Sequence, residues 1–296
     1  MPDSDDEFRA TIAEDLTDLD RQRVYADFLE ESGDELAEYI RLWADIQAKP
    51  EADDKLFALH LRRARMIKAN AELWQWDNFL ALRHQDKYIR QVEELVEAHS
   101  RHLEVLRADE SDVRRLEELL NTHLPIGYRE YVTKVADSTT VSGPHPGLEG
   151  VFVSSVTEVV RGLEADPGYL QRARSPAAND WKQGFESQAT KYPRVVDVDR
   201  DHSWEETETG FVLLGSFPWL GTSYGMLINA EMSGVLVEDF DGLHYCATDW
   251  DDANMQREDA ERIRQPEASG PLEVQRLPLD TFSAMHCMFV GYLRHS

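Results

Sequence analysis

The residues of this sequence whose types and spacing best suit chemistry are carboxylates in its last third. One run carries acids at the first, third, fifth, ninth and twelfth positions of a possible loop: Asp197, Asp199, Asp201, Glu205 and Glu208. Oxygen ligands at this spacing surround Ca²⁺ in EF-hand loops, but the sixth position, which needs glycine for a sharp turn, is His202. We therefore interpret the run as a solvated acidic loop, with a calcium site at Asp197, Asp199, Asp201 and Glu208 as the alternative.

A second group of carboxylates lies close to large aromatic residues. Negative charge steers the encounter with a basic partner, and tryptophans anchor the partner once it is bound. The alternative is that the tryptophans belong to the core and the carboxylates are only solvated. We predict a partner-binding surface made of Trp204, Trp219, Glu238, Asp239, Asp241, Asp249, Trp250, Asp251 and Asp252.

The sequence lacks motifs that would indicate catalysis. The sequence has no glycine-rich phosphate loop, no Gly-x-Ser-x-Gly and no basic stripe with interleaved aromatics. His99 and His102 would share a helix face, but nothing nearby supplies the third ligand of a metal site. We therefore expect no enzyme activity and no cofactor.

The charge balance restricts the class of partner. The chain holds 57 acids and 31 bases, a net charge of −26, and the excess lies in residues 1–58 and 192–296. Such a chain is repelled by nucleic acid and by anionic membranes, so a macromolecular partner, if there is one, is expected to be basic. The alternative is that the acidity only keeps the protein soluble. The N-terminus lacks the charge pattern of a signal peptide, no apolar run could span a membrane, and two cysteines exclude a disulfide framework. These features favour a cytoplasmic protein.

The first 110 residues show helical periodicity. A capping box at Ser4–Glu7 predicts one helix start, and a second helix is expected from near Asp18 to Ser32-Gly33. Further helices are predicted over 34–48, 52–72 and 73–83, and one long amphipathic helix over 86–106.

The remainder of the chain has a different character. Helices are expected at Val113–Asn121, around Tyr128–Val135 and at Leu279–Leu293, with a loop over 138–150 and a polar stretch over 251–270. Between them lie short strand-like runs, which predict an α+β domain with an antiparallel sheet: 151–153, 194–198, 211–215, 225–230, 234–240 and 243–247. The expected organisation is a helical domain (1–84), a connecting helix (85–110) and an α+β domain (111–296).

One segment of the helical part resembles a known family. Arg23-Val-Tyr-Ala-Asp-Phe-Leu-Glu-Glu-Ser-Gly33, followed by Glu38-Tyr-Ile-Arg-Leu42, is similar to the bacterial repeat-companion domain over roughly residues 5–82. Phe28, Tyr39 and Trp43 replace the Trp, Phe and Gln that are usual in that family. The family has no established activity, so this resemblance implies a helical fold and no function.

The second half resembles the SUKH superfamily of bacterial immunity proteins. Four segments carry the likeness in order: Arg115–Val132 with its Leu-Pro, Phe211-Val-Leu-Leu-Gly215, the pair Gly225–Ala230 and Gly234–Gly242, and Phe282–Leu293. The glycine-rich turn that usually follows the second helix is replaced by Asp137-Ser-Thr-Thr140, and residues 165–193 have no counterpart in the family.

The SUKH resemblance implies an antiparallel sheet flanked by helices and a non-catalytic binding function. An immunity protein of this kind would bind and neutralise a cognate toxin, for example a nuclease, through an acidic surface. Because a fold does not fix a function, a regulatory or scaffold protein with no toxin partner remains the alternative.

Overall fold

The structure of the chain is a computed structural model. It describes residues 5–49, 56–99, 103–141, 152–177, 209–217, 222–230, 232–239, 243–245 and 280–295. The chain divides into two compact units, Met1–Arg83 and His84–Ser296. Each unit is described below by itself.

The described part of the first unit is helical. Its helices are α1 (Asp5–Glu14), α2 (Leu19–Ser32), α3 (Leu36–Gln47), α4 (Leu56–Ala69) and α5 (Glu72–Ala81), and a short 3₁₀ turn, η1 (Leu82–His84), follows. The side chain of Asp18 accepts hydrogen bonds from the first backbone N–H groups of α2, and Gly33 ends the helix with a left-handed φ of 73°. The start and the end predicted for this helix are confirmed.

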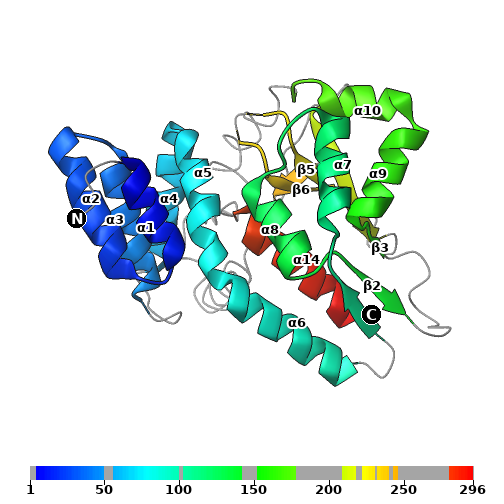
Figure 1. Cartoon of the computed structure of the whole chain (residues 1–296), viewed down its shortest axis with the longest axis horizontal. Coiled ribbons are helices and arrows are strands. Elements are labelled where there is room, and N and C mark those ends of the chain that lie inside the picture. The colour runs from blue at the N-terminus through cyan, green and yellow to red at the C-terminus, as the bar shows by residue number, and fades with distance from the viewer. Residues whose placement is uncertain are drawn as a thin grey trace, which may run out of the picture. The chain divides into compact units, whose positions relative to one another are not determined.

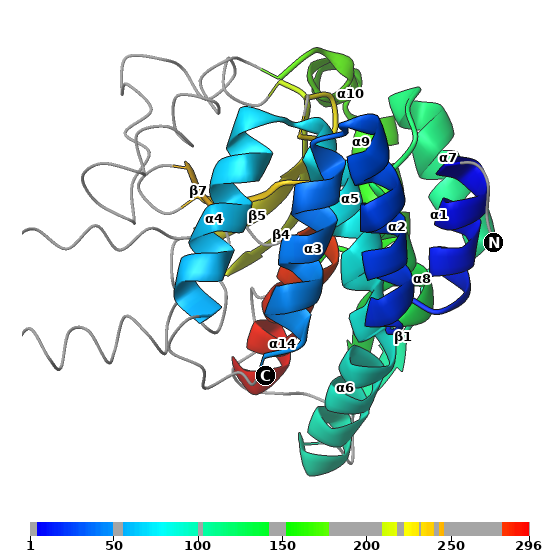
Figure 2. The same ribbon diagram turned by 90° about the vertical axis from the view of Figure 1, so that its left-hand side faces the viewer.

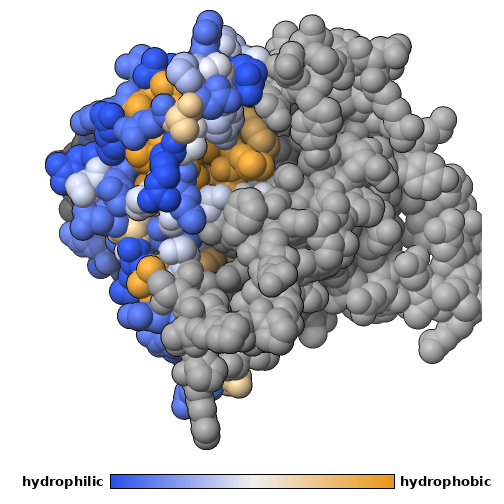
Figure 3. Space-filling view, turned by 90° about the vertical axis from the view of Figure 1, so that its right-hand side faces the viewer, coloured by the Kyte–Doolittle hydropathy of each residue, from blue (hydrophilic) through white to orange (hydrophobic). Residues whose placement is uncertain are grey.

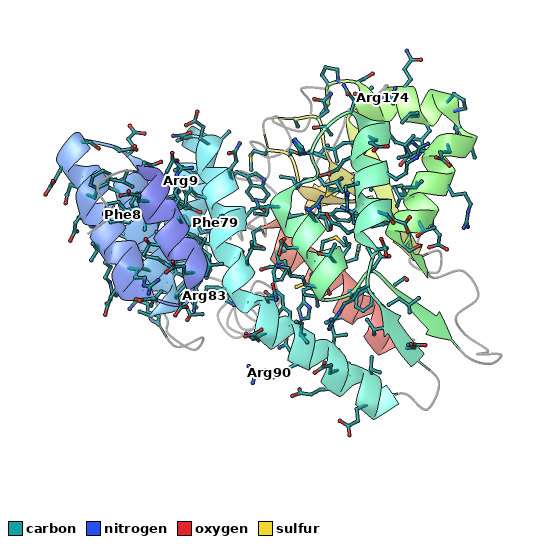
Figure 4. The ribbon with its side chains drawn as sticks, viewed as in Figure 1. Phe8, Arg9, Phe79, Arg83, Arg90 and Arg174 are labelled. Atoms are coloured by element: carbon teal, nitrogen blue, oxygen red, sulfur yellow. The ribbon has the colours of Figure 1, made fainter. Side chains whose placement is uncertain are left out.

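Helix α3 is the central element of the first unit. Eight of its residues are buried, including Tyr39, Ile40 and Trp43, and it runs beside α2 (Figure 2). Between α1, α2 and α5 lies an aromatic cluster, in which Phe8 and Trp76 both contact Tyr25. Arg9 lies 4.7 Å from the centre of the Trp76 ring and Phe79 meets the same ring edge-on at 5.7 Å (Figure 4).

The second unit combines helices with antiparallel sheets, so the predicted α+β class is confirmed at that level. Its helices are α6 (Gln85–His99), α7 (Glu110–Leu120), α8 (Ile126–Lys134), α9 (Val156–Ala165), α10 (Pro167–Arg174) and α14 (Thr281–His295). Its strands are β1 (Leu103–Leu106), β2 (Ser138–Val141), β3 (Phe152–Val153), β4 (Phe211–Phe217), β5 (Thr222–Leu227), β6 (Leu236–Asp239) and β7 (Leu243–Tyr245).

The larger sheet has five strands in the order β3-β4-β5-β6-β7, and every neighbouring pair is antiparallel. Gly225 of β5 pairs with Leu213 of β4, and the Phe211 ring occupies the space that a side chain at position 225 would need. A Cβ atom added there would lie 1.7 Å from the ring, so a side chain at position 225 would force the Phe211 ring to move.

Two predictions for the segment after residue 85 are wrong in part. The long helix expected over 86–106 ends at His99, and Leu103–Leu106 forms β1, which pairs with Ser138–Val141 inside the predicted loop 138–150. The β-branched residues of Ser138-Thr-Thr-Val141 favour a strand, and pairing with them outweighs the helical pattern. Helix α6, expected to connect two domains, packs on α14 and α8 within the second unit (Figure 1).

Helices α9 and α10 were not predicted. Ser155 and Glu158 form a capping box at the start of α9, and Asp166 caps α10, whose first residue is Pro167. Both helices pack on α7, and α9 also contacts β4. They form a helical layer on one side of the larger sheet.

Candidate functional site

Most residues of the predicted partner-binding surface lie outside the described part of the chain. These are Trp204, Trp219, Asp241, Asp249, Trp250, Asp251 and Asp252. The alternative calcium ligands Asp197, Asp199, Asp201 and Glu208 also lie outside it. Within the ranges that are described, no group of three or more His, Cys, Asp or Glu side chains could hold a metal ion.

Glu238 and Asp239 are the two predicted partner-binding residues that the structure places. Both belong to β6, where Glu238 pairs with Tyr224 and His244, and Asp239 pairs with Ser223 and Leu243. The structure therefore places both residues on one strand, between β5 and β7.

The surface of the second unit that carries α9 and α10 is mainly hydrophilic, with hydrophobic residues between the polar ones (Figure 3). Leu213 of β4 is 38% exposed, and its backbone N–H donates a hydrogen bond of 2.7 Å to the Tyr169 hydroxyl of α10. Strand β3 pairs only with Gly215 and Ser216 of β4, so the Leu213 N–H lies beyond its reach, and the Tyr169 hydroxyl accepts it instead.

The first unit contains a buried ion pair that the sequence did not reveal. Asp77 of α5 accepts hydrogen bonds from Arg63 Nε at 2.7 Å and Arg63 Nη2 at 2.8 Å. It also accepts one from Trp43 Nε1 at 3.0 Å and a short one from the Tyr39 hydroxyl. Every donor is buried, so this network fixes α3, α4 and α5 relative to one another.

His60 lies beside the same network. Arg63 Nη1 is 3.1 Å from His60 Nδ1, and because guanidinium only donates, Nδ1 accepts. Burial, and then the positive charge of Arg63, lower the pKa of His60 to about 3. The imidazole is therefore neutral at physiological pH and acts as part of the packing.

A second polar cluster joins α6, α8 and α14. His286 Nε2 lies 2.8 Å from Gln91 Oε1, its Nδ1 lies 3.3 Å from the Tyr131 hydroxyl, and its ring stacks on Tyr88 at 3.8 Å. A carbonyl oxygen only accepts, so Nε2 carries the proton and Nδ1 accepts from Tyr131. His286 thus has structural contacts, and its neighbour Cys287 is of intermediate exposure.

A buried carboxyl follows α8. Asp137 is 6% exposed, and its Oδ1 accepts a hydrogen bond of 2.9 Å from the backbone N–H of Val156. The nearby Tyr128 is 1% exposed, and its hydroxyl has no hydrogen-bond partner among the described residues. One feature of the sequence indicated that this segment is unusual: Asp137-Ser-Thr-Thr140 replaces the glycine-rich turn of the SUKH superfamily.

Comparison of the chain with models of known protein families, and with curated proteins, finds no match. Among the described residues, no helix has both the length and the apolar character needed to cross a membrane.

Proposed function

We propose that the chain is a non-catalytic binding protein of the SUKH type, which neutralises a basic cognate toxin in the bacterial cytoplasm. The observation that carries the proposal is the order of elements in the second unit. The four segments of the resemblance coincide with α7 and α8, then β4, then β5 and β6, and finally α14. A helical pair, an antiparallel sheet and a closing helix are what that resemblance implies.

The charge of the chain also supports a basic partner. The net charge is −26, and residues 192–296 hold 19 acids against seven arginines. A field of this strength speeds the encounter with a positively charged surface, such as the phosphate-binding groove of a nuclease. The candidate contacts include Glu238 and Asp239 of β6.

A scaffold or regulatory protein is the second candidate. It is favoured by the first unit, a compact helical body that is separate from the SUKH-like unit. A scaffold protein needs a second binding module besides the one that contacts its first partner, and the first unit would supply it.

Co-expression separates the two candidates. The gene next to this one is expressed with and without the chain, growth is scored, and any complex is purified. Killing by the neighbour and rescue in a stable complex would support the immunity function. A harmless neighbour, or one that does not bind, would favour the scaffold function.

The acidic surface is then tested by charge reversal in the purified complex. Glu238→Lys and Asp239→Lys are each compared with Glu94→Lys, an exposed acid of α6 with the same change of charge. A specific contact predicts that one β6 variant raises Kd at least tenfold more than Glu94→Lys, and that affinity falls with salt. Equal weakening by all three, or a complex insensitive to salt, would contradict a localised electrostatic interface.

A further inference from the structure

Asp137 connects three elements of the second unit. It lies between α8 and β2, and its backbone N–H donates to the Leu106 carbonyl at the end of β1, at 2.8 Å. Its side chain accepts the N–H of Val156, the first residue of α9. The carboxyl therefore holds the start of α9 against the end of the β1–β2 pair.

The charged groups that face this carboxyl have the same sign. They are Glu158 of α9 and Asp112 of α7, and Asp112 is itself held in place by a hydrogen bond of 2.8 Å from Thr157. From α8 the neighbour is the buried Tyr128, whose pKa is raised by burial and by the Asp137 charge. In the part of the chain that is described, no lysine, arginine or histidine pairs with Asp137.

A carboxyl in this position is hard to ionise. Burial disfavours the charged form most, Glu158 and Asp112 add repulsion, and the Val156 N–H is the one group that favours it. The pKa of Asp137 is consequently raised to about 7. The folded unit therefore takes up a proton at a pH where the unfolded chain has already lost it.

We propose that Asp137 is a proton-dependent latch: the neutral carboxyl allows the start of α9 to pack over it, and its ionisation loosens that packing. The Val156 hydrogen bond itself favours the charged form, but the loss of hydration on burial and the like charges of Glu158 and Asp112 outweigh it. The inference stands independently of the proposed function. Helix α9 continues through Asp166 into α10, which carries the Tyr169 hydroxyl that covers Leu213. Loosening of α9 would therefore also affect α10 and the hydrogen bond between Tyr169 and Leu213 of β4.

The sign of the effect follows from the raised pKa. A folded-state pKa above the unfolded one gives stability that is complete in acid and is lost as pH rises through about 7. Between pH 6 and pH 8, the unfolding equilibrium constant should rise about tenfold through this group alone. Because other groups titrate in the same pH range, the contribution of Asp137 is isolated by comparing the unmodified protein with a variant that lacks this carboxyl.

The first test uses the unmodified full-length protein. The ¹³C shift of the Asp137 side-chain carboxyl is followed by NMR from pH 4 to pH 9, together with amide exchange at Val156 and Thr157. A transition centred near neutrality, with faster relative exchange of those amides above it, supports the latch. If the Asp137 carboxyl finishes its titration below pH 5, the latch is excluded. This outcome does not depend on the folding of a variant.

The second test compares Asp137→Asn with Asp166→Asn in the full chain. The first keeps an oxygen that accepts from Val156 and removes the charge. The second changes an exposed carboxylate that also caps a helix, α10. The tenfold rise between pH 6 and pH 8 should disappear in Asp137→Asn and persist in Asp166→Asn. Persistence of the full rise in Asp137→Asn would exclude Asp137 as its origin.

Discussion

Asp77 and Asp137 are both buried aspartates, but their surroundings differ. Asp77 accepts hydrogen bonds from three side chains, one of which is the guanidinium of Arg63. Asp137 accepts one backbone hydrogen bond and faces two other carboxylates. A buried charge is stable when donors compensate its lost hydration. Asp77 therefore forms a structural ion pair with Arg63, whereas Asp137 changes its charge with pH.

Removal of Asp77 is expected to be costly, because Arg63 would remain charged and buried without its partner. Asp77→Ala should lower the free energy of unfolding of the first unit by about 3–5 kcal/mol. Chemical denaturation followed by hydrogen exchange in peptides from α3 and α5 measures the loss in that unit.

Asp27→Ala is the matched control, since it removes one carboxylate that pairs with Arg41 on the exposed surface. Solvent screens such a pair, so the unfolding transition should be nearly unchanged. If the two variants unfold alike, the Arg63–Asp77 network does not stabilise the unit as we argue.

Among the elements, those with local end signals could be predicted from the sequence. Asp18 and Gly33 predicted both ends of α2 because a cap and a left-handed glycine act within one turn. The same logic applied to Ser155-x-x-Glu158 and to Asp166-Pro167 would have found α9 and α10.

Other features depend on residues that are distant in sequence. Strand β1 forms because Leu103–Leu106 meets Ser138–Val141, and no local pattern reports that pairing. Asp77 likewise meets Arg63, Tyr39 and Trp43 only after three helices pack. For the predicted partner surface, the strand predicted over 234–240 contains Glu238 and Asp239, but its pairing with β5 and β7 is a long-range feature that the local pattern does not report.

The β4–β5 pair gives a prediction for a single element. Gly225→Ala should lower the free energy of unfolding of the second unit by about 1–3 kcal/mol, because the new methyl group would collide with the Phe211 ring. Thermal and chemical unfolding of the full chain measure it. The smaller side chain of Phe211→Leu should remove the collision. The double variant Gly225→Ala/Phe211→Leu should therefore regain part of the stability that Gly225→Ala loses.

Gly162→Ala in α9 is the control for that substitution. Nothing lies within 4 Å of a Cβ atom at this helical position. Alanine should therefore stabilise the unit by roughly 0.5–1 kcal/mol through its better helix propensity. If both substitutions changed the free energy of unfolding in the same direction, the collision with Phe211 would not explain the effect of Gly225→Ala.

At the scale of the whole molecule, the two units are expected to respond to pH in opposite directions. The pKa of His60 is lowered to about 3, so its contribution to stability is present above the unfolded value of 6.5 and is lost as pH falls toward 3. Asp137 acts the other way, because its stabilising contribution is lost as pH rises through about 7. The first unit should weaken in acid and the second in mild base.

The variant His60→Gln tests the predicted loss of stability of the first unit in acid. Between pH 7 and pH 5, unfolding of the first unit should become easier by roughly 1–2 kcal/mol in the unmodified chain. In the variant this dependence should be much smaller, while the second unit keeps its own. Unit-resolved hydrogen exchange at both pH values measures the difference. An identical slope in the variant would mean that His60 is not the titrating group.

The contacts around Ala177 and Gly210 bear on how this gene can change. The Ala177 N–H donates to the Asn229 carbonyl, the Gly210 N–H donates to the Arg172 carbonyl, and a Cβ on Gly210 would lie 2.6 Å from the Ala177 nitrogen. Two points far apart in sequence are thus anchored side by side. The codon for Gly210 is therefore constrained, because any side chain there would collide with the Ala177 backbone and would need a φ of 69°, which residues other than glycine rarely adopt.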